Sequence, residues 1–312
     1  MTLTELRYII AVARERHFGR AAKACFVSQP TLSVAIKKLE EELGVTLFER
    51  ANNEVTPTPV GGQVVEQAQR VIEQAGSIKD IAKLGKDPLA GPLRIGMIYT
   101  IAPYLLPGVV RLLHKRAPSM PLHLQENYTH RLRELLKQGE LDAAVLALPF
   151  EESGFVIDPV YDEPFVVAVP REHEWAERKS VKSAELKQQS MVLLGTGHCF
   201  RDQVLLASPE LNRFAANNGM QKTFEGSSLE TIRQMVASGV GLTVLPSSSV
   251  PGNVPRDSML RYVPFSKPVP DRRVVLVYRK SFPRPAAIAA LRQAILDCPL
   301  SGVTKLNNKP AR

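Results

Sequence analysis

Apolar residues recur at spacings of three and four along the first sixty residues, and this pattern predicts a group of short helices. The apolar faces of the first two helices run from Leu3 to Ala13 and from Phe18 to Cys25. A third helix begins near Ser28, because serine is a favoured N-cap and Pro30 fits only in the first turn of a helix. The second and third helices, joined by a tight turn, form a helix-turn-helix pattern.

The outward face of the third helix is polar. Short hydrogen-bonding groups and cations, which suit base edges and phosphates in a major groove, lie there at Gln29, Thr31, Ser33, Lys37 and Lys38. From the pattern alone, the alternative stays open that this is the solvated face of an ordinary amphipathic helix.

A longer helical pattern follows from Pro59 to about Asp87. Its apolar seam consists of Val60, Val64, Ala68, Val71, Ile72, Ala75, Ile78 and Ala82. We interpret this segment as a linker and dimerisation helix, because so long an apolar seam needs a partner helix. A dimer would place two recognition helices on successive faces of the major groove. The alternative is packing within one chain.

After Pro88–Pro92 the pattern changes to alternating strands and helices. Strands are predicted at Leu93–Ile98, Leu122–Glu126, Asp142–Ala147, Phe165–Val169, Met191–Leu194, Leu242–Leu245 and Val274–Tyr278. Helices are predicted at Tyr104–Lys115, His130–Gln138, Leu229–Ser238 and Ala286–Leu296. Such alternation predicts parallel sheets with helices on both faces.

Two proline-containing segments, Asp162–Pro164 and Lys267–Pro270, predict crossings between two halves of this region. The fold class is therefore α/β with an N-terminal all-α part, and the α/β region has two lobes with a cleft between them, as in periplasmic binding proteins. Ligands in such folds bind outside the carboxyl ends of strands. Thr100, Thr129 and the segment Gly195–Asp202 fall at that position, although helix N-capping is the alternative role for the two threonines.

Composition and charge limit the class of protein. The 312 residues suffice for about two domains. The net charge of +9 favours a polyanionic partner, but residues 1 to 87 hold 12 Lys and Arg against 11 Asp and Glu, so the excess lies elsewhere. Because no segment resembles a signal peptide or a membrane span of ~18 apolar residues, a cytoplasmic setting is expected.

The three cysteines, Cys25, Cys199 and Cys298, exclude a disulfide framework and a CxxC zinc site, so no metal or cofactor is predicted. Cys199 lies within the segment GTGHCFRDQ, at or just before the first turn of a predicted short helix from Phe200 to Ala207. The helix dipole, His198 and Arg201 all favour the thiolate, which is the form that attacks peroxides. The alternative is that Cys199 is a small buried hydrophobe.

Three ordered segments resemble the N-terminal signature of LysR-type transcriptional regulators: Phe18–Ala22, Val27–Ser33 and Leu39–Arg50. The resemblance implies a winged helix-turn-helix that binds promoter DNA. It implies contacts to bases and phosphates from Ser28, Gln29, Pro30, Thr31, Ser33, Lys37 and Lys38. Residues 49 to 59, with a turn at Asn52-Asn53, would form the wing, from which Arg50 reaches the DNA backbone or minor groove. The acidic run Glu40–Glu42 would be a solvated face with no special role.

The C-terminal half resembles the peroxide-sensing OxyR branch of that family, through Gly197–Gln203, Ser228–Thr231 and Leu276–Arg279. The resemblance implies that Cys199 is the peroxidatic cysteine. Around it, Thr100, Thr129 and His198 would orient hydrogen peroxide, Arg201 and Asp202 would hold the loop, and Arg272 would stabilise a thiolate or sulfenate from across the cleft. It also implies a homo-oligomer, with a tetramer favoured over a dimer, and RNA polymerase as a further partner.

One position departs from the branch. Where its members have a resolving cysteine, nine residues after the reactive one, this chain has Ser208. Nine residues of helix separate two Cα atoms by ~13 Å, whereas a disulfide requires them within about 7 Å, so closing that bond would unwind the segment. Two explanations stay open: an engineered Cys→Ser change, which we favour, and a natural member that relies on sulfenic acid or another thiol.

These observations predict a DNA-binding regulator that senses hydrogen peroxide through Cys199, controls antioxidant genes and has no enzymatic turnover. The alternative is a LysR-type regulator that binds a small organic effector in the inter-lobe cleft. A thiol peroxidase is disfavoured, because no second thiol is near and the helix-turn-helix would be unexplained. The expected domains are residues 1–58, the winged helix-turn-helix; 59–88, the linker helix; 89–161 with 268–300, lobe I; and 162–267, lobe II.

Overall fold

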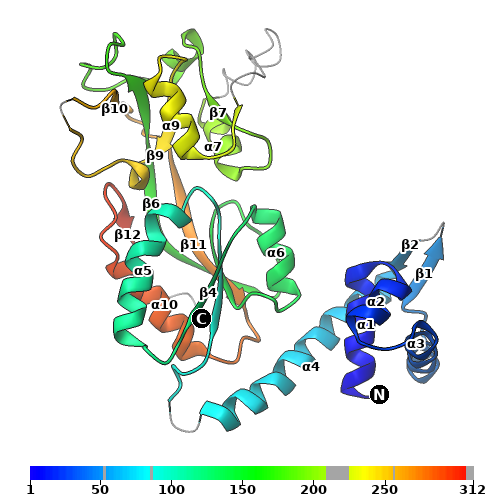
Figure 1. Cartoon of the computed structure of the whole chain (residues 1–312). Helices are drawn as coiled ribbons and strands as arrows, with labels where there is room; N and C mark the ends of the chain where they lie inside the picture. Colours follow the sequence, from blue (N-terminus) through cyan, green and yellow to red (C-terminus); the bar gives the residue numbers. More distant parts are fainter. Residues whose placement is uncertain (52–53, 85–86, 209–224, 256, 307–312) are drawn as a thin grey trace. The chain divides into compact units, whose positions relative to one another are not determined.

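The N-terminal helices form where the apolar periodicity places them. In the computed structural model, which describes residues 1–51, 54–84, 87–208, 225–255 and 257–306, α1 spans Leu3–Glu15, α2 spans Phe18–Ala24 and α3 spans Gln29–Leu43 (Figure 1). Ser28 is the N-cap of α3, as predicted, and its hydroxyl accepts the Thr31 amide at 3.3 Å. Buried apolar residues from the three helices form one core.

The wing is a two-stranded antiparallel ribbon. Strand β1 spans Phe48–Ala51 and pairs with β2, Glu54–Pro57. The turn at Asn52-Asn53 and the side chain of Arg50 lie outside the described parts of the chain. Glu40 corrects one expectation, because its carboxylate accepts the backbone amides of Leu47 and Phe48 at 2.7 and 3.3 Å and thereby anchors the start of the ribbon.

Helix α4 spans Pro59–Leu84 and begins at a proline, which the first turn of a helix tolerates. Part of its apolar seam packs within the chain: Ala68 is buried in the core of α1 to α3, and Val64 and Ile72 pack against that core. Other seam positions are open, with Val71 and Ile78 36% and 68% exposed. Packing within one chain, the alternative considered from the sequence, is therefore confirmed for part of the seam, and dimerisation through the open positions stays a prediction.

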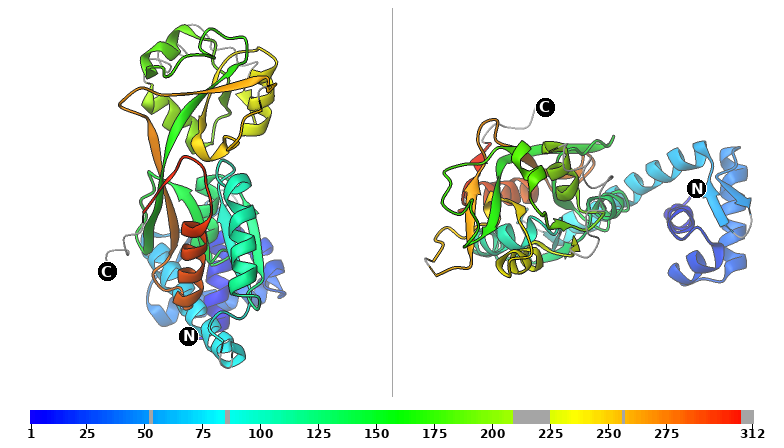
Figure 2. Two further views of the ribbon diagram at one scale, coloured as in Figure 1. Left: turned by 90° about the vertical axis from the view of Figure 1, so that its left-hand side faces the viewer. Right: turned by 90° about the horizontal axis from the view of Figure 1, so that it is seen from above.

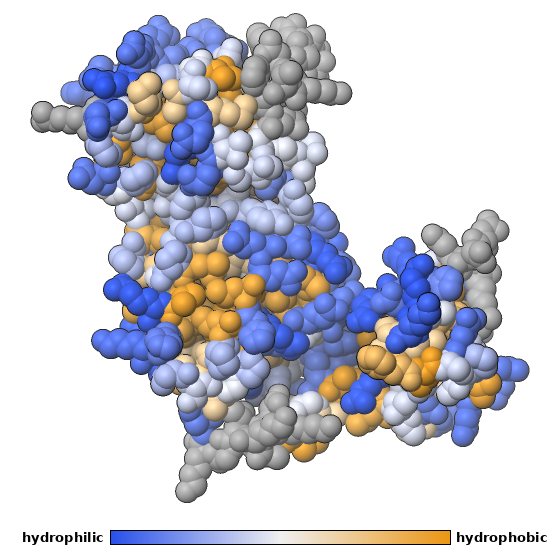
Figure 3. Space-filling model, viewed as in Figure 1, coloured by the Kyte–Doolittle hydropathy of each residue, from blue (hydrophilic) through white to orange (hydrophobic). Residues whose placement is uncertain are grey.

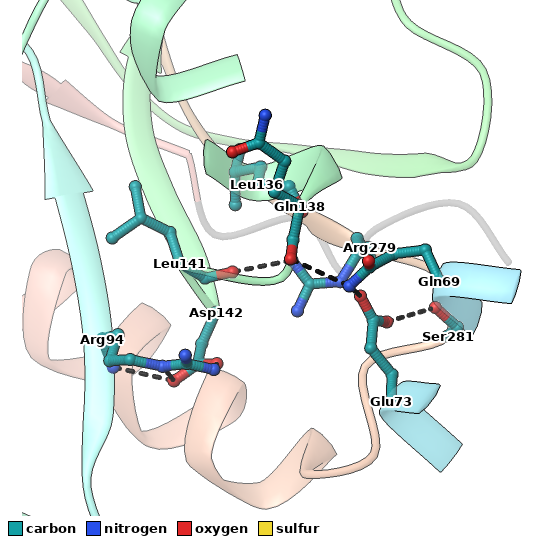
Figure 4. Close-up of polar contacts among 9 residues, drawn as sticks. All are labelled: Gln69, Glu73, Arg94, Leu136, Gln138, Leu141, Asp142, Arg279 and Ser281. Carbon is teal, nitrogen blue, oxygen red and sulfur yellow. Dashed lines mark hydrogen bonds and ion pairs between the residues drawn. The ribbon is translucent and has the colours of Figure 1, made fainter. Parts of the chain in front are cut away.

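Residue contacts divide the described chain into two units. The first holds Met1–Pro88 with two short later segments, Lys137–Glu140 and Ser281–Arg284; the second holds the remainder. Within the first unit, Gln69 of α4 donates to the Gln138 carbonyl at 2.8 Å, and Ser281 donates to Glu73 at 3.2 Å (Figure 4). These bonds hold the two short segments against α4.

The second unit is built on one mixed sheet. Its strands are β3 (Leu93–Met97), β4 (Leu122–Glu126), β5 (Ala143–Ala147), β6 (Phe155–Pro170), β9 (Thr243–Pro246), β10 (Leu260–Pro264), β11 (Asp271–Arg279) and β12 (Thr304–Lys305). The main path runs β10-β6-β11-β5-β3-β4, and β9 and β12 also pair with β6. Among the described strands of this sheet, only β3 has parallel neighbours, which are β4 and β5, so the predicted parallel sheets are wrong in part. The long strands β6 and β11 run antiparallel to their neighbours and join the two ends of the sheet.

Helices cover the sheet at both ends. Around β3 to β5 lie α5 (Ala102–Arg116), α6 (Thr129–Lys137) and α10 (Pro285–Asp297), with α10 beside α5 (Figure 2). At the other end lie α7 (Cys199–Ala207), α9 (Leu229–Ala237), the short 3₁₀ helices η1 (Ser183–Gln188) and η3 (Ser247–Ser249), and a small parallel pair of β7 (Leu193–Leu194) with β8 (Glu225–Gly226). No described helix is both long and apolar enough to cross a membrane.

Buried charged groups fix the ends of several elements. Asp142 accepts the Arg94 amide and guanidinium at 2.8 and 2.7 Å and thereby aligns β5 with β3 (Figure 4). The Arg279 guanidinium donates to the carbonyls of Leu136 and Leu141, where α6 ends and β5 approaches. A cation at this position is favourable because the C-terminal carbonyls of a helix carry partial negative charge.

Candidate functional site

Parallel pairing brings two threonines to one edge of the sheet. Thr100 follows β3 and Thr129 follows β4, and the carboxyl ends of parallel strands lie at the same edge. The N-capping alternative is wrong for both: Ile101 is the N-cap residue of α5, and the Thr129 hydroxyl has no hydrogen-bond partner in the described chain. Both hydroxyls are therefore available for other roles.

Cys199 is the first residue of α7, as the sequence predicted. Gly197 precedes it with φ +96°, a conformation that favours glycine, and an added Cβ there would lie 3.4 Å from the Tyr128 ring. Arg201 donates to the Leu194 carbonyl at 2.7 Å and so ties the start of the helix to the end of β7. The half-buried thiol therefore lies at the positive end of a helix dipole.

Aromatic rings enclose His198. Its imidazole lies edge-on to Tyr128 and Tyr99, with ring centroids 4.9 and 5.8 Å away, and the two tyrosines also contact each other at 5.3 Å. This burial lowers the pKa of His198, against the opposing effect of a backbone hydrogen bond to Ser227. At neutral pH the imidazole is uncharged, so it supplies no positive charge beside Cys199.

These groups line one small pocket. Its walls are Ile98, Tyr99, Thr100, Asn127, Tyr128, Thr129, Gly197, His198 and Cys199, and its volume is about 10 Å³. That is roughly the space that a single water molecule needs. The pocket thus brings together four of the residues predicted from the sequence, Thr100, Thr129, His198 and Cys199, in a space suited to a molecule of a few atoms.

Arg272 lies behind the pocket wall and acts on Thr100. Its guanidinium donates to the Thr100 hydroxyl at 2.8 Å and to the Thr100 carbonyl at 3.0 Å. It also pairs with Glu163 at 2.7 Å, and both side chains are fully buried. The described contacts of Arg272 thus lie with these two residues and with the Phe200 ring, 5.1 Å away, so its position bears on Cys199 through Thr100.

Three further residues lie around α7 without lining the pocket. Asp202 is exposed in the first turn, where a carboxylate is favoured by the helix dipole. Arg201 holds the loop as described above. Ser208 is the C-cap of α7, only 4% exposed, and its amide donates to the Val204 carbonyl at 3.1 Å.

Sequence reasoning missed two residues of this region. Gln203 donates from α7 to the Leu148 carbonyl at 2.7 Å and so connects the helix to the segment after β5. Glu163 was treated only as part of a crossing. Gln203 belongs to the GHCFRDQ motif, which offered a signal, whereas nothing local to Glu163 indicates a pairing with a residue 109 positions away.

The predicted DNA-reading face is open to solvent. Ser28, Gln29, Pro30, Thr31, Lys37 and Lys38 are exposed and Ser33 is half-buried. The Ser28 hydroxyl is shared with Thr31 at 2.8 Å, so these two groups already serve the start of α3. Lys37 has only a loose contact of 3.9 Å with Glu41, which leaves its ammonium accessible to a phosphate.

Comparisons with known proteins agree over nearly the whole chain. Residues 3–62 match the bacterial regulatory helix-turn-helix proteins of the lysR family, and residues 86–298 match the LysR substrate binding domain. The hydrogen peroxide-inducible genes activator of Pectobacterium carotovorum is 42% identical over 283 residues, which cover 91% of this chain and 92% of that protein. The DNA-binding transcriptional dual regulator OxyR of Escherichia coli is 41% identical over 295 residues, 95% of each chain.

Solved structures give the same result. Full-length OxyR from Pseudomonas aeruginosa, in a Cys-to-Asp variant, matches with a TM-score of 0.74 and 52% identity over 96% of this chain and 98% of that one. A hydrogen-peroxide-bound OxyR variant from Corynebacterium glutamicum matches with a TM-score of 0.64 and 33% identity over 95% of this chain and 92% of that one.

Proposed function

Because the chain belongs to the LysR family of transcriptional regulators, and to its OxyR branch, we propose that it is a DNA-binding regulator that senses hydrogen peroxide. Peroxide oxidises Cys199, and this oxidation controls the transcription of antioxidant genes. The observation that carries the proposal is the pocket at the N-terminus of α7, where a cysteine and two threonine hydroxyls share a volume of about 10 Å³. Two hydroxyls and a thiol in so small a space favour hydrogen peroxide over larger organic peroxides.

The pocket residues take separate roles in the proposed reaction. The Thr100 and Thr129 hydroxyls hydrogen-bond the two peroxide oxygens and orient one of them toward the sulfur of Cys199. His198 closes the pocket as a neutral imidazole held between Tyr99 and Tyr128. Arg201 and Asp202 keep the first turn of α7 in place, and Arg272 fixes Thr100.

The DNA-binding role rests on the exposed face of α3. Gln29, Thr31 and Ser33 are placed to contact base edges, and Lys37 and Lys38 to contact phosphates. Pro30 sets the start of the helix and Ser28 caps it. Arg50, whose side chain lies outside the described parts of the chain, stays a predicted DNA contact of the wing. The protein acts where the chromosome is, in the cytoplasm, with RNA polymerase as its downstream partner and without catalytic turnover.

Open apolar positions support a homo-oligomer. Figure 3 shows apolar side chains gathered over α5 and β4 of the second unit, where Val110 and Leu124 are 37% and 41% exposed. Strand β4 is also an edge of the sheet, which proteins usually cover. Ile78 of α4 is a further exposed apolar side chain that an oligomer could cover.

The organic-effector alternative has its own observation. A larger hollow of about 690 Å³, lined by residues that include Leu148, Gln203 and Lys267, lies in the second unit. Its size suits a small organic ligand. The peroxide function is preferred because the small pocket holds the cysteine and two threonine hydroxyls. A relative named above is also an activator of hydrogen peroxide-inducible genes.

A reporter assay distinguishes the two functions. A gene is placed behind a DNA fragment that the protein itself retains from genomic DNA, in a host without a peroxide regulator of its own. With Ser208→Cys, which supplies the second thiol, expression should rise within minutes of peroxide addition, and Cys199→Ser in the same background should abolish the rise. A peroxide response that persists without Cys199 would contradict the proposed function.

A further inference from the structure

The pair formed by Glu163 and Arg272 is the most deeply buried ion pair in the described chain, with both side chains fully buried. The two residues face each other across the pairing of β6 with β11. Glu163 is held on both oxygens: Oε2 accepts from the Arg272 Nε at 2.7 Å, and Oε1 accepts the Ser248 amide at 2.9 Å. The carboxylate therefore has one fixed orientation, and the guanidinium that it binds has one as well.

The direction of the hydrogen bond to Thr100 is the informative feature. An arginine can only donate, so the Thr100 oxygen accepts from Arg272 at 2.8 Å. The hydroxyl hydrogen of Thr100 can then still be donated, and it has no acceptor among the described residues. Thr100 lines the small pocket beside Cys199, so its hydrogen is available to whatever molecule occupies that space.

We propose that Glu163 is a positioning residue for the peroxide reaction: by aiming Arg272 at Thr100, it makes the Thr100 hydroxyl a fixed hydrogen-bond donor to the bound peroxide. This inference rests on the proposed function. The relay runs from Ser248 through Glu163 and Arg272 to Thr100, and its members come from η3, β6, β11 and the segment after β3. Thr129, whose hydroxyl has no hydrogen-bond partner among the described residues, can complete the peroxide's hydrogen bonds.

The chemistry explains why a fixed donor matters. The Cys199 thiolate attacks one peroxide oxygen, the S–O bond forms and the O–O bond breaks, so sulfur is oxidised to sulfenic acid and the peroxide is reduced. The second oxygen departs as hydroxide, takes a proton from solvent and leaves as water. A preorganised donor at a peroxide oxygen stabilises the charge that develops as the O–O bond breaks.

Glu163→Gln tests the relay in the full-length reduced chain, because glutamine has the same shape but leaves the arginine without its anion. The rate constant for sulfenic acid formation at Cys199 should fall about tenfold, as expected for a misplaced donor. Alkylation of the same thiol by iodoacetamide, which needs no such donor, should change less than about twofold. In the Thr100→Val background, Glu163→Gln should have no further effect, because the two changes remove one interaction.

Two more variants keep the test independent of folding. Asp158→Asn disrupts another buried pair on β6, with Arg292 at 2.8 Å, and should leave the peroxide rate unchanged. The double variant Glu163→Leu with Arg272→Met removes both buried charges. Its peroxide reaction should still be slow, because no guanidinium then donates to the Thr100 oxygen.

The possible results separate the inference from the proposed function. Any of three results would overturn the relay. The peroxide rate could be unchanged in Glu163→Gln, it could be that of the wild type in the double replacement, or Glu163→Gln could slow the reaction further in the Thr100→Val background. A wild-type chain in which Cys199 reacts no faster with peroxide than Cys298 would instead overturn the proposed function itself.

Discussion

At the scale of single residues, the site depends on which groups remain able to donate or accept a hydrogen bond once their neighbours are in place. The Thr100 oxygen accepts a hydrogen bond from Arg272, so its hydroxyl hydrogen remains able to donate. The Thr129 hydroxyl has no hydrogen-bond partner among the described residues. His198 is enclosed by rings and uncharged at neutral pH. The pocket is therefore lined by neutral hydrogen-bonding groups around one sulfur, and Arg272, which donates to Thr100, is itself paired with Glu163.

His198 gives a prediction about pH. Its folded pKa is lowered by burial, so below its ordinary pKa of about 6.5 the unfolded chain takes up a proton that the folded chain does not. Stability from this group is complete above that pH and falls as pH decreases toward the folded pKa. Urea unfolding followed by the fluorescence of Trp175, the single tryptophan, should show lower stability at pH 5.5 than at pH 7.5.

His198→Asn is the control for that measurement, because asparagine does not titrate. The difference in stability between the two pH values should be smaller in this variant. Trp175 reports on the relevant core, since it shares a cluster of buried side chains with Phe200. An equal pH dependence in both proteins would show that the buried imidazole is not its source.

On the DNA-reading face, two neighbouring residues should differ in what they contribute. Gln29→Ala should relax sequence preference at a cost of about 1 to 3 kcal/mol per lost base contact. Lys37→Ala should instead weaken binding to all sequences and lower the slope of affinity against salt concentration by about one ion. Gel shifts in a salt series, with selected and scrambled DNA, measure both. Unchanged binding in both variants would remove α3 as the reading helix.

At the scale of elements, short helices end on particular backbone conformations. Helix α2 ends with the Phe26 amide on the Lys23 carbonyl and the Val27 amide on the Ala22 carbonyl, at 3.1 and 3.0 Å. This motif places Phe26 in the left-handed region, with φ +58°, where glycine is preferred. The ring is 95% exposed, so no packing compensates for the strain. The turn of the helix-turn-helix thus stores strain at one residue.

Phe26→Gly should therefore stabilise this turn by about 1 kcal/mol. Amide hydrogen exchange of residues 18 to 43 measures the effect locally. Phe26→Ala is the matched control, because it removes the ring but keeps the Cβ, and it should leave protection nearly unchanged. If the glycine variant exchanges as fast as the alanine variant, the backbone at this position is not strained.

Helix α7 is the element that is affected by having serine instead of cysteine at position 208. With Ser208 at its C-cap, oxidised Cys199 has no partner to close a disulfide, so the account predicts sulfenic acid and, at excess peroxide, sulfinic acid. Ser208→Cys should give an intramolecular disulfide, which requires unwinding because a helix of this length separates the two Cα atoms by ~13 Å. Limited proteolysis across residues 195 to 225 should change on oxidation only in that variant. A full peroxide-induced change in the present chain would mean that sulfenic acid alone carries the signal.

At the scale of the whole molecule, local sequence patterns predicted where helices and strands lie better than they predicted which of them pair with one another. Helices α5, α6, α9 and α10 begin and end within two residues of the predicted bounds, because apolar periodicity is a local property. Strand β6 was predicted only from Phe165, since Pro159 and Pro164 argue against a strand. The structure accommodates Pro159 at an irregularity in the register opposite Val274 and Val275, so the strand continues from Phe155 to Pro170.

In the candidate site, too, some residues could be predicted from the sequence and others could not. Cys199 and the threonines could be found because a motif and two strand ends mark them. The pairing of Glu163 with Arg272 could not, because it depends on the register between two strands far apart in the sequence. The extent to which the seam of α4 packs on its own chain also depends on tertiary contacts that no periodicity specifies.

We infer that the fold makes Cys199, of the three cysteines, the one that reacts with hydrogen peroxide. Burial raises the pKa of both Cys25 and Cys298, which keeps these thiols protonated and slow. The most direct test adds less than one equivalent of peroxide per chain to the reduced full-length protein in the presence of a sulfenic-acid probe, and locates the probe by mass spectrometry. We expect the probe to label Cys199 almost alone. Equal labelling of the three cysteines, or preferential labelling of Cys298, would contradict it.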